Sequence, residues 1–295
     1  MGLMRVYADL HIHSKYSRAT SGKMDVEDLV RFARLKGLNL LGTGDATHPS
    51  WLRELGKKLV YDEDSWLYKP SHDKGSDVYF MVTAEVNTVF EVEGKVRRVH
   101  HLILLPSLED AEELSRRLSK YGDVTSDGRP TLNMTAAELV EIALEVNNWN
   151  MVIPAHVWTP WFSLFGSKNG FNSVEECYED MAKNIFALET GLSSDPAMNW
   201  MVSSLDKYTL ISNSDSHSPW PYRLGREANV FELKEPSYRE IYNAIRNKDR
   251  RVLLFTVEVD PSYGKYHFDG HRKCGVCLHP RDCLLYTSPS PRDRG

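Results

Sequence analysis

The sequence lacks the features of a membrane or secreted protein. It has no run of about eighteen apolar residues, which a bilayer-spanning helix would need. Its N-terminus, MGLMRVYADLHIH, lacks the charged and then apolar layout of a secretory signal. Only four cysteines occur among 295 residues, which argues against a disulfide framework. We therefore expect a cytoplasmic protein with reduced thiols and no membrane partner.

Two further absences limit the function. The net charge of -5 gives no general attraction to nucleic acid. The basic clusters at 95–98, 246–251 and 271–273 are short and typical of solvated faces. No GxxxxGK[ST] phosphate loop is present, so ATP-driven unwinding is unsupported.

What is present is a regular alternation of strand-like and helix-like segments. Apolar or β-branched runs predict strands at 6–11, 38–45, 78–85, 151–156, 185–190, 208–215, 228–233 and 251–258, with a hairpin over 88–106. Amphipathic stretches predict helices near 25–36, 108–120, 135–147, 173–183, 196–205 and 236–248. Alternation over residues 1–258 favours an α/β barrel, whose chemistry lies at the carboxyl ends of its strands.

Metal-binding residue types collect at these strand ends. They are His11, His13, Asp45, Glu85, His101, His156, Asp215 and His217. His11 and His13 are two residues apart on a strand, so both rings point the same way, and Asp215 and His217 repeat this spacing. Buried imidazoles and carboxylates without partners would be costly, so we interpret the set as a metal site.

Six motifs stand in the order of the PHP (polymerase and histidinol phosphatase) superfamily: HIHSKYS, GTGD, TAEV, HHLIL, PAHVW and SNSDSHS. Longer stretches, including GTGDATHP, IPAHVWTPWFSLFGSKNGF, FALETGLSSDPAMNW and LGREANVFE, resemble the endonuclease Q family over about residues 5–282. The resemblance implies a distorted (β/α)7 barrel with two or three zinc, manganese or magnesium ions. It also implies hydrolysis of a DNA phosphodiester 5′ of a deaminated base (uracil, hypoxanthine or xanthine) or an abasic site, in DNA repair.

The resemblance further implies how the ligands are shared. One ion would be held by His11, His13, Glu85 and Asp215, and Glu85 would bridge to a second ion completed by His101 and His156. A third would take Asp45, His48 and His217. Two departures affect this third site: Arg18 and Ala19 stand where many relatives have an acid or histidine, and Ala46 follows Asp45 where a histidine is usual. His48 is therefore either a ligand or a pocket histidine, and strand alternation lets only one of His100 and His101 face the pocket.

The candidate catalytic residues are Asp215, Glu85 and His217. Metal ions a few ångströms apart lower the pKa of bound water and stabilise the attacking and leaving oxygens. Asp215 either orients or deprotonates that water in addition to binding metal, or binds metal only.

The candidate substrate-binding residues follow two of the ligands. Trp158, Trp161 and Phe165 come after His156 and could stack on nucleobases, or they are core packing. Arg223 and Arg226 follow His217 and could contact a phosphate, or they form surface ion pairs. Glu189 ends a strand and could hydrogen-bond a ligand histidine.

The C-terminal stretch predicts an incomplete second site. Cys274 and Cys277 form the CxxC of a zinc-ribbon knuckle over residues 259–282, and a second pair would be needed to hold a structural zinc. Residues 283–295 lose all periodicity and resemble a translated sequencing adapter, so we interpret them, including Cys283, as a non-native tail.

Two other functions compete with a DNA endonuclease. A phosphomonoesterase of the histidinol-phosphatase type would use the same ions but has no use for a zinc ribbon. A non-catalytic PHP scaffold would be expected to have lost ligands, and here many are retained. Damaged DNA is therefore the expected partner. Repair or replication proteins are possible further partners, but the sequence does not identify them.

Overall fold

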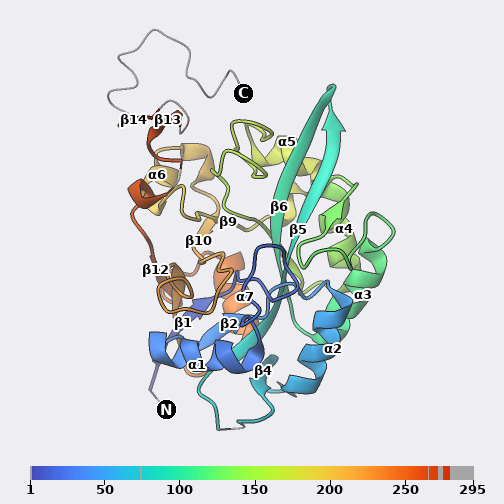
Figure 1. Ribbon diagram of the computed structural model, residues 1–295, viewed down its shortest axis with the longest axis vertical. Coiled ribbons are helices and arrows are strands. Elements are labelled where there is room, and N and C mark those ends of the chain that lie inside the picture. The colour runs from blue at the N-terminus through green and yellow to red at the C-terminus, as the bar shows by residue number, and fades with distance from the viewer. Residues whose placement is uncertain (1, 74, 265, 272–274, 280–295) are drawn as a thin grey trace.

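The chain folds into a mixed α/β structure built around one large sheet (Figure 1). The computed structural model describes residues 2–73, 75–264, 266–271 and 275–279. The strands are β1 (Met4–Asp9), β2 (Leu40–Gly42), β3 (Leu59–Asp62), β4 (Leu67–Pro70), β5 (Tyr79–Val92), β6 (Lys95–Leu105), β7 (Thr131–Leu132), β8 (Met151–Pro154), β9 (Ala187–Glu189), β10 (Thr209–Ile211), β11 (Ala228–Leu233), β12 (Leu253–Val257), β13 (Asp269–His271) and β14 (Val276–Leu278). The helices are α1 (Val26–Lys36), α2 (Pro49–Lys58), α3 (Leu108–Leu118), α4 (Ala136–Val146), α5 (Val174–Tyr178), α6 (Pro196–Trp200) and α7 (Tyr238–Arg246).

Local sequence signals account for the ends of the main helices. The Asp25 side chain accepts the N–H of Asp28 at the start of α1, and Gly37 ends this helix in the left-handed conformation with φ of 82°. Thr135 and Glu138 form a reciprocal capping box at the start of α4. These helices match the predicted ranges closely. Helix α2 and the β3–β4 hairpin were not predicted.

The sheet has ten strands and joins distant parts of the chain. Strands β1, β2 and β5 pair in parallel, β5 and β6 form a long antiparallel hairpin, and β6 pairs on its other side with β8. Strands β9 and β10 form a separate parallel pair. An isolated bridge between Ile12 and Ser216 joins the segment after β10 to the segment after β1, and the N–H of Val157 donates to the carbonyl of Glu189 between β8 and β9.

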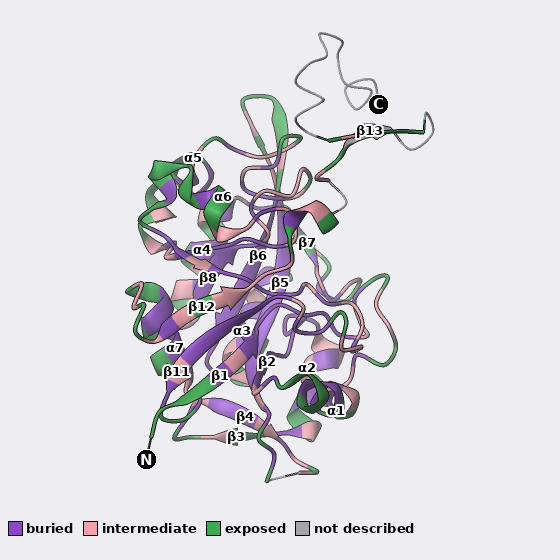
Figure 2. Cartoon of the chain, turned by 90° about the vertical axis from the view of Figure 1, so that its left-hand side faces the viewer, coloured by how far each residue is buried: buried purple, intermediate pink, exposed green. Residues whose placement is uncertain are grey.

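The β5–β6 hairpin projects beyond the rest of the sheet (Figure 1). Glu93 and Gly94 form its two-residue turn, with φ of 52° and 73°, as the commonest tight hairpin turn requires. Its tip is exposed, whereas the central strands are buried (Figure 2). Helices α2, α3, α4 and α5 pack successively against one another along one side of the sheet (Figure 1).

The hairpin is apolar on both faces, as a strand covered on both sides should be. Met81, Leu102 and Leu104 pack into one buried cluster, while Val82 and Ile103 pack into another. Glu85 continues the first face, because alternate residues of a strand point the same way. The first face therefore leads directly to the predicted metal site.

Among the described residues, no helix has both the length and the apolar character needed to cross a membrane.

Candidate metal centre

Four of the predicted ligands meet at one point. His11 and His13 follow β1, Glu85 lies within β5, and Asp215 follows β10. Nε2 of His13 lies 3.1 Å from Oε2 of Glu85 and 3.0 Å from Oδ1 of Asp215. Nε2 of His11 lies 3.5 Å and 3.9 Å from the same two oxygens. All four ligand atoms lie within 4.8 Å of one another, close enough to surround one ion.

A second group shares Glu85 with the first. Oε1 of Glu85 lies 2.8 Å from Nδ1 of His100 and 3.2 Å from Nε2 of His156. These two ring nitrogens are 3.3 Å apart. Since Oε2 of Glu85 faces the first group and Oε1 faces the second, this carboxylate is placed to bridge two ions.

The structure places His100 in this group instead of His101, which corrects the sequence prediction. In the hairpin register Glu85 pairs with Leu102, so His100 shares the face of Glu85 and His101 points to the opposite face. Both ring nitrogens of His101 are occupied there, at 2.8 Å from the Thr88 hydroxyl and 2.8 Å from the Tyr178 hydroxyl.

The predicted third group is not brought together: among the described residues, the ligand atoms of Asp45, His48 and His217 do not all lie within 4.8 Å of one another. Asp45 accepts the N–H and the hydroxyl of Ser14, both at 2.6 Å, and lies 3.0 Å from Nδ1 of His13. His48 caps α2, and its Nε2 lies 3.1 Å from the carbonyl of Thr125.

His217 lies beside the first group of ligands. Its ring is 4.3 Å from that of His13, and its Nδ1 lies 2.9 Å from the backbone carbonyl of Asp215. Donation from Nδ1 to this carbonyl leaves Nε2 as an acceptor.

Carboxylates behind the site fix the two histidines that follow β1. Nδ1 of His11 lies 3.0 Å from both oxygens of Glu189, and Nδ1 of His13 lies 3.0 Å from Asp45. Glu189 also accepts the backbone N–H of His156 at 2.8 Å. A carboxylate at Nδ1 leaves Nε2 free to bind metal, which is the usual arrangement around metal-binding histidines.

Two observations indicate that the first group fits a divalent cation. Nε2 of His11 is buried and has no hydrogen-bond partner, although it points toward two carboxylates. Burial alone would raise the pKa of Glu85, but the surrounding imidazoles and the Arg129 guanidinium hold this pKa well below its ordinary range. Burial would likewise raise the pKa of Asp215, yet its histidine neighbours lower it. Both carboxylates are therefore ionised.

A pocket of about 360 Å³ opens onto the second group and Asp215. Trp161 and Phe162 form part of its wall, and the Phe162 ring stacks on His100 at 5.3 Å. Trp158 and Phe165 do not line it: their rings pack together at 4.6 Å, and Trp158 donates its indole N–H to Asn199. Of the three predicted aromatics, only Trp161 lines this pocket.

Arg129 and Phe162 also line this pocket, although neither was predicted from the sequence. Arg129 reaches Glu85 from the segment between α3 and β7, with its Nη1 3.1 Å from Oε2. A lone arginine outside any periodic pattern carries no signal in a single sequence. Phe162 could have been suspected, because it lies in the aromatic run that begins at Trp158.

Arg223 and Arg226 line a neighbouring cavity of about 450 Å³ together with His217 and Asp215. Arg226 donates from Nε and Nη2 to the carbonyl of Ser214, and neither arginine forms a salt bridge with a described carboxylate. Asp215 lines both this cavity and the pocket described above.

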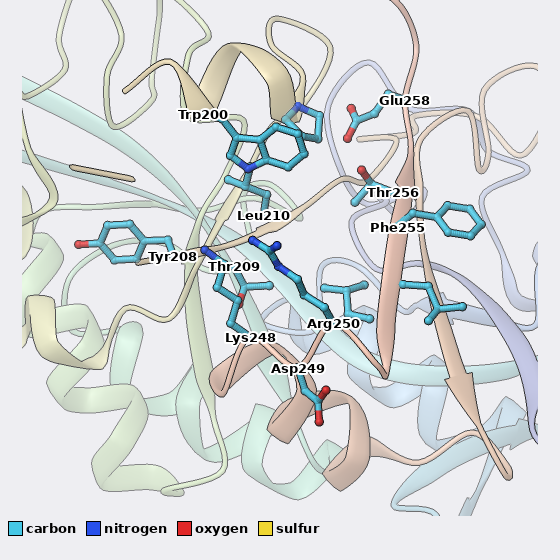
Figure 3. A pocket seen from close by; sticks show the side chains of 13 residues that line it. Trp200, Tyr208, Thr209, Leu210, Lys248, Asp249, Arg250, Phe255, Thr256 and Glu258 are labelled. Carbon is cyan, nitrogen blue, oxygen red and sulfur yellow. The ribbon is translucent and has the colours of Figure 1, made fainter. Parts of the chain in front are cut away.

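Another pocket, of about 410 Å³, contains none of the predicted metal ligands (Figure 3). The Trp200 indole and the Glu258 carboxylate lie along its upper side in Figure 3, with Lys248 and Arg250 below them.

The predicted zinc knuckle is described only in part. Cys277 lies on β14 and is exposed, whereas Cys274 and Cys283 fall outside the described residues.

Comparisons with known proteins give two curated relatives, and no family model matches the chain. The chain is 29% identical over 288 residues to the uncharacterized protein YqxK of Bacillus subtilis, covering 92% of this chain and 70% of that protein. It is 40% identical over 167 residues to the uncharacterized protein MJ0043 of Methanocaldococcus jannaschii, a match to 56% of this chain. That match spans only 18% of the length of MJ0043.

Similar solved structures identify the family. The lesion-specific endonuclease PfuEndoQ from Pyrococcus furiosus superposes with a TM-score of 0.82 at 37% identity, over 98% of this chain and 67% of that one. An endonuclease Q bound to a 27-mer duplex with an abasic lesion at the active site gives 0.83 at 37% identity, over 98% and 68%. A Bifidobacterium adolescentis protein described as a metal-dependent phosphoesterase shares the fold at 15% identity, with a TM-score of 0.50 over 80% of this chain and 95% of that one. The chain therefore belongs to the endonuclease Q family of the PHP superfamily.

Proposed function

We infer that this chain is a metal-dependent endonuclease that hydrolyses a DNA phosphodiester 5′ of an abasic or deaminated nucleotide. The observation that carries the proposal is the pair of ligand groups sharing Glu85, on a chain that is 37% identical to endonuclease Q in complex with abasic duplex DNA. Uracil, hypoxanthine and xanthine are proposed as the deaminated bases.

The donor set limits the choice of ion. The two groups together offer four imidazoles and two carboxylates: His11, His13, His100, His156, Glu85 and Asp215. Imidazole suits zinc and other transition metals, whereas magnesium prefers oxygen ligands and water. We therefore favour zinc or manganese over magnesium.

The chain's own residues supply orientation and charge. Glu189 and Asp45 hold the His11 and His13 rings, so that both Nε2 atoms point to one place. Divalent cations bound there would lower the pKa of a water molecule and stabilise charge on the phosphoryl oxygens. Asp215 is the ligand best placed to orient that water, because its side chain is 35% exposed whereas Glu85 is fully buried.

The position of Asp215 between two cavities suits a DNA strand that passes through the site. Attack by water forms one bond to phosphorus, the bond to the leaving oxygen breaks, and a proton passes to that oxygen. Trp161 and Phe162 are placed to contact the nucleotide in one cavity. Arg223 and Arg226 are placed to contact backbone phosphate in the other, next to His217.

The ring of strands supports a distorted (β/α)7 barrel for residues 1–258. Strands β1, β2, β5, β6 and β8 pair in sequence, and β9 and β10 pair with each other. The Ile12–Ser216 bridge and the bond from Val157 to Glu189 lie at the two junctions that would close the ring.

The test is cleavage of defined oligonucleotides by the purified chain. Duplexes with one abasic site, uracil, hypoxanthine or xanthine are incubated with Mn²⁺, Zn²⁺ or Mg²⁺, beside an undamaged duplex and a phosphomonoester. We expect metal-dependent nicking 5′ of the lesion that is lost in Asp215→Asn. Hydrolysis of the phosphomonoester alone would instead establish a phosphatase.

A further inference from the structure

The guanidinium of Arg129 contacts Glu85, on the carboxylate oxygen that would bind a metal ion in the first ligand group. Its Nη1 is 3.1 Å from Oε2 of Glu85, and the same oxygen lies 3.1 Å from Nε2 of His13 and 3.5 Å from Nε2 of His11. Arg129 is mostly buried, with its side chain 27% exposed. Among the described residues that line the metal pocket, it is the only arginine or lysine.

The backbone around Arg129 is held firmly in place. The N–H of Gly128 donates to the carbonyl of Tyr16 at 3.0 Å, and the N–H of Asn87 donates to the carbonyl of Pro130 at 3.0 Å. Asp127 accepts the N–H of Arg129 at 3.2 Å. Arg129 is therefore presented to the pocket from a fixed position.

Gly128 allows this segment to approach the metal centre closely. A Cβ at this position would overlap the Asp45 carboxylate and the Ser17 hydroxyl. The segment thus contacts the carboxylate that orients His13, and the next residue supplies the guanidinium that contacts Glu85.

A divalent cation and this guanidinium would compete for the same oxygen. Both are positive, and they would repel each other at a separation of a few ångströms in a buried site. Filling the first ligand group should therefore displace Arg129 from Glu85 unless an anion lies between them. A phosphodiester is such an anion, and a guanidinium is shaped to bind two of its oxygens at once.

We propose that Arg129 neutralises Glu85 while the metal ions are absent and, once they bind, contacts a non-bridging oxygen of the phosphodiester to be cleaved. This inference rests on the proposed function. Arg129 would thus have two roles: it lowers the affinity of the first ligand group for metal, and it stabilises the negative charge that grows on the phosphate during hydrolysis.

The test separates these roles by measuring metal binding and cleavage independently. Arg129→Gln and Arg129→Lys are titrated with Mn²⁺ without DNA and then assayed for cleavage of an abasic duplex. Arg116→Gln is the matched control, because Arg116 is exposed and pairs with Glu113 on α3.

We expect Arg129→Gln to bind Mn²⁺ severalfold more tightly than the wild type, while its kcat/KM for cleavage falls on the order of 10²-fold. Arg129→Lys keeps the charge but loses the planar fork, so its Mn²⁺ affinity should stay near the wild-type value and its kcat/KM should fall about tenfold. The control should change neither quantity.

Weaker Mn²⁺ binding by Arg129→Gln would show a structural role and overturn the proposal, as would cleavage close to the wild-type rate. If Arg129→Gln does not fold, Arg129→Lys decides, and wild-type cleavage by that variant overturns the proposal. A wild-type chain that cuts no damaged duplex refutes the proposed function instead, and the Mn²⁺ titration still tests whether Arg129 competes for Glu85.

Discussion

Two sets of carboxylates in this molecule have opposite surroundings. Glu85 and Asp215 face imidazoles and a guanidinium, which keep both carboxylates ionised. Glu227 and Glu258 instead share one hydroxyl, that of Ser212, at 3.1 Å and 3.2 Å. One hydroxyl proton cannot serve two carboxylates at once. The further donors are also neutral, since the Thr190 hydroxyl reaches Glu258 and the Val259 N–H reaches Glu227, both at 3.4 Å.

The pKa values follow this difference. Burial, together with the charge of Glu258, raises the pKa of Glu227 to about 8. Burial raises the pKa of Glu258, which also borders the pocket of Figure 3, to about 7. Such an acid therefore becomes a cation site only where positive neighbours keep it ionised. Glu85 and Asp215 meet this condition, whereas Glu227 holds a proton at neutral pH and Glu258 titrates near it.

Glu85→Gln should have the largest effect, because it removes the one charge that both ligand groups share. We expect loss of most bound metal and a fall in kcat/KM for abasic duplex on the order of 10³-fold. Elemental analysis of the purified protein and cleavage kinetics would measure both. Glu258→Gln is the matched control and should keep its metal. Equal metal content in the two variants would mean that the difference in ionisation does not determine where cations bind.

A smaller effect is expected when either of two adjacent histidines is replaced. His100 lies on the metal-facing side of β6, and His101 lies on the opposite, packed side. His100→Ala should weaken metal binding at the second group and lower cleavage by about 10- to 100-fold, with little change in folding. His101→Ala should keep the metal but lose about 1–3 kcal/mol of unfolding free energy, because the buried Tyr178 hydroxyl loses its partner and the Thr88 hydroxyl keeps only a 3.4 Å bond to the Val99 carbonyl. Metal titration and urea unfolding distinguish the two variants. Metal loss that is greater in His101→Ala would restore the original sequence prediction.

This pair of histidines also shows how far the sequence could lead. The ligand types at the strand ends predicted a metal site, and the family resemblance implied both ligand groups except for this one choice. The Glu93–Gly94 turn decides between the two histidines, because a two-residue turn fixes the pairing register of β5 and β6. That register places His100 on the face of Glu85. Applying that register to the sequence would have identified His100.

Other features depend on contacts that no local pattern encodes. Asp45 was predicted as a ligand from its strand-end position, but its oxygens are occupied by Ser14 and His13. His48 lies where helix α2 begins, and this helix was not predicted. Arg129 reaches the centre from the segment between α3 and β7, which backbone hydrogen bonds tie to Tyr16 and Asn87.

Glu227→Gln should have the smallest effect on activity, and the size of its effect on stability depends on pH. The pKa of Glu227 is about 8 in the folded chain, against an ordinary value of 4.5. The folded state therefore holds the proton more tightly, and the stability that this gives is present below pH 4.5 and is lost as the pH rises through 8. Glutamine is neutral at every pH, so the variant should be more stable than the wild type at pH 9, by up to about 5 kcal/mol, and should differ little at pH 4.5. Urea unfolding at both pH values, with EDTA present to remove the pH dependence of metal binding, measures this difference in stability.

The exposed Glu240→Gln is the control and should show no such change with pH. A Glu227→Gln variant no more stable than the wild type at pH 9 would mean that Glu227 is ionised in the folded chain without cost, which would remove the contrast with Glu85.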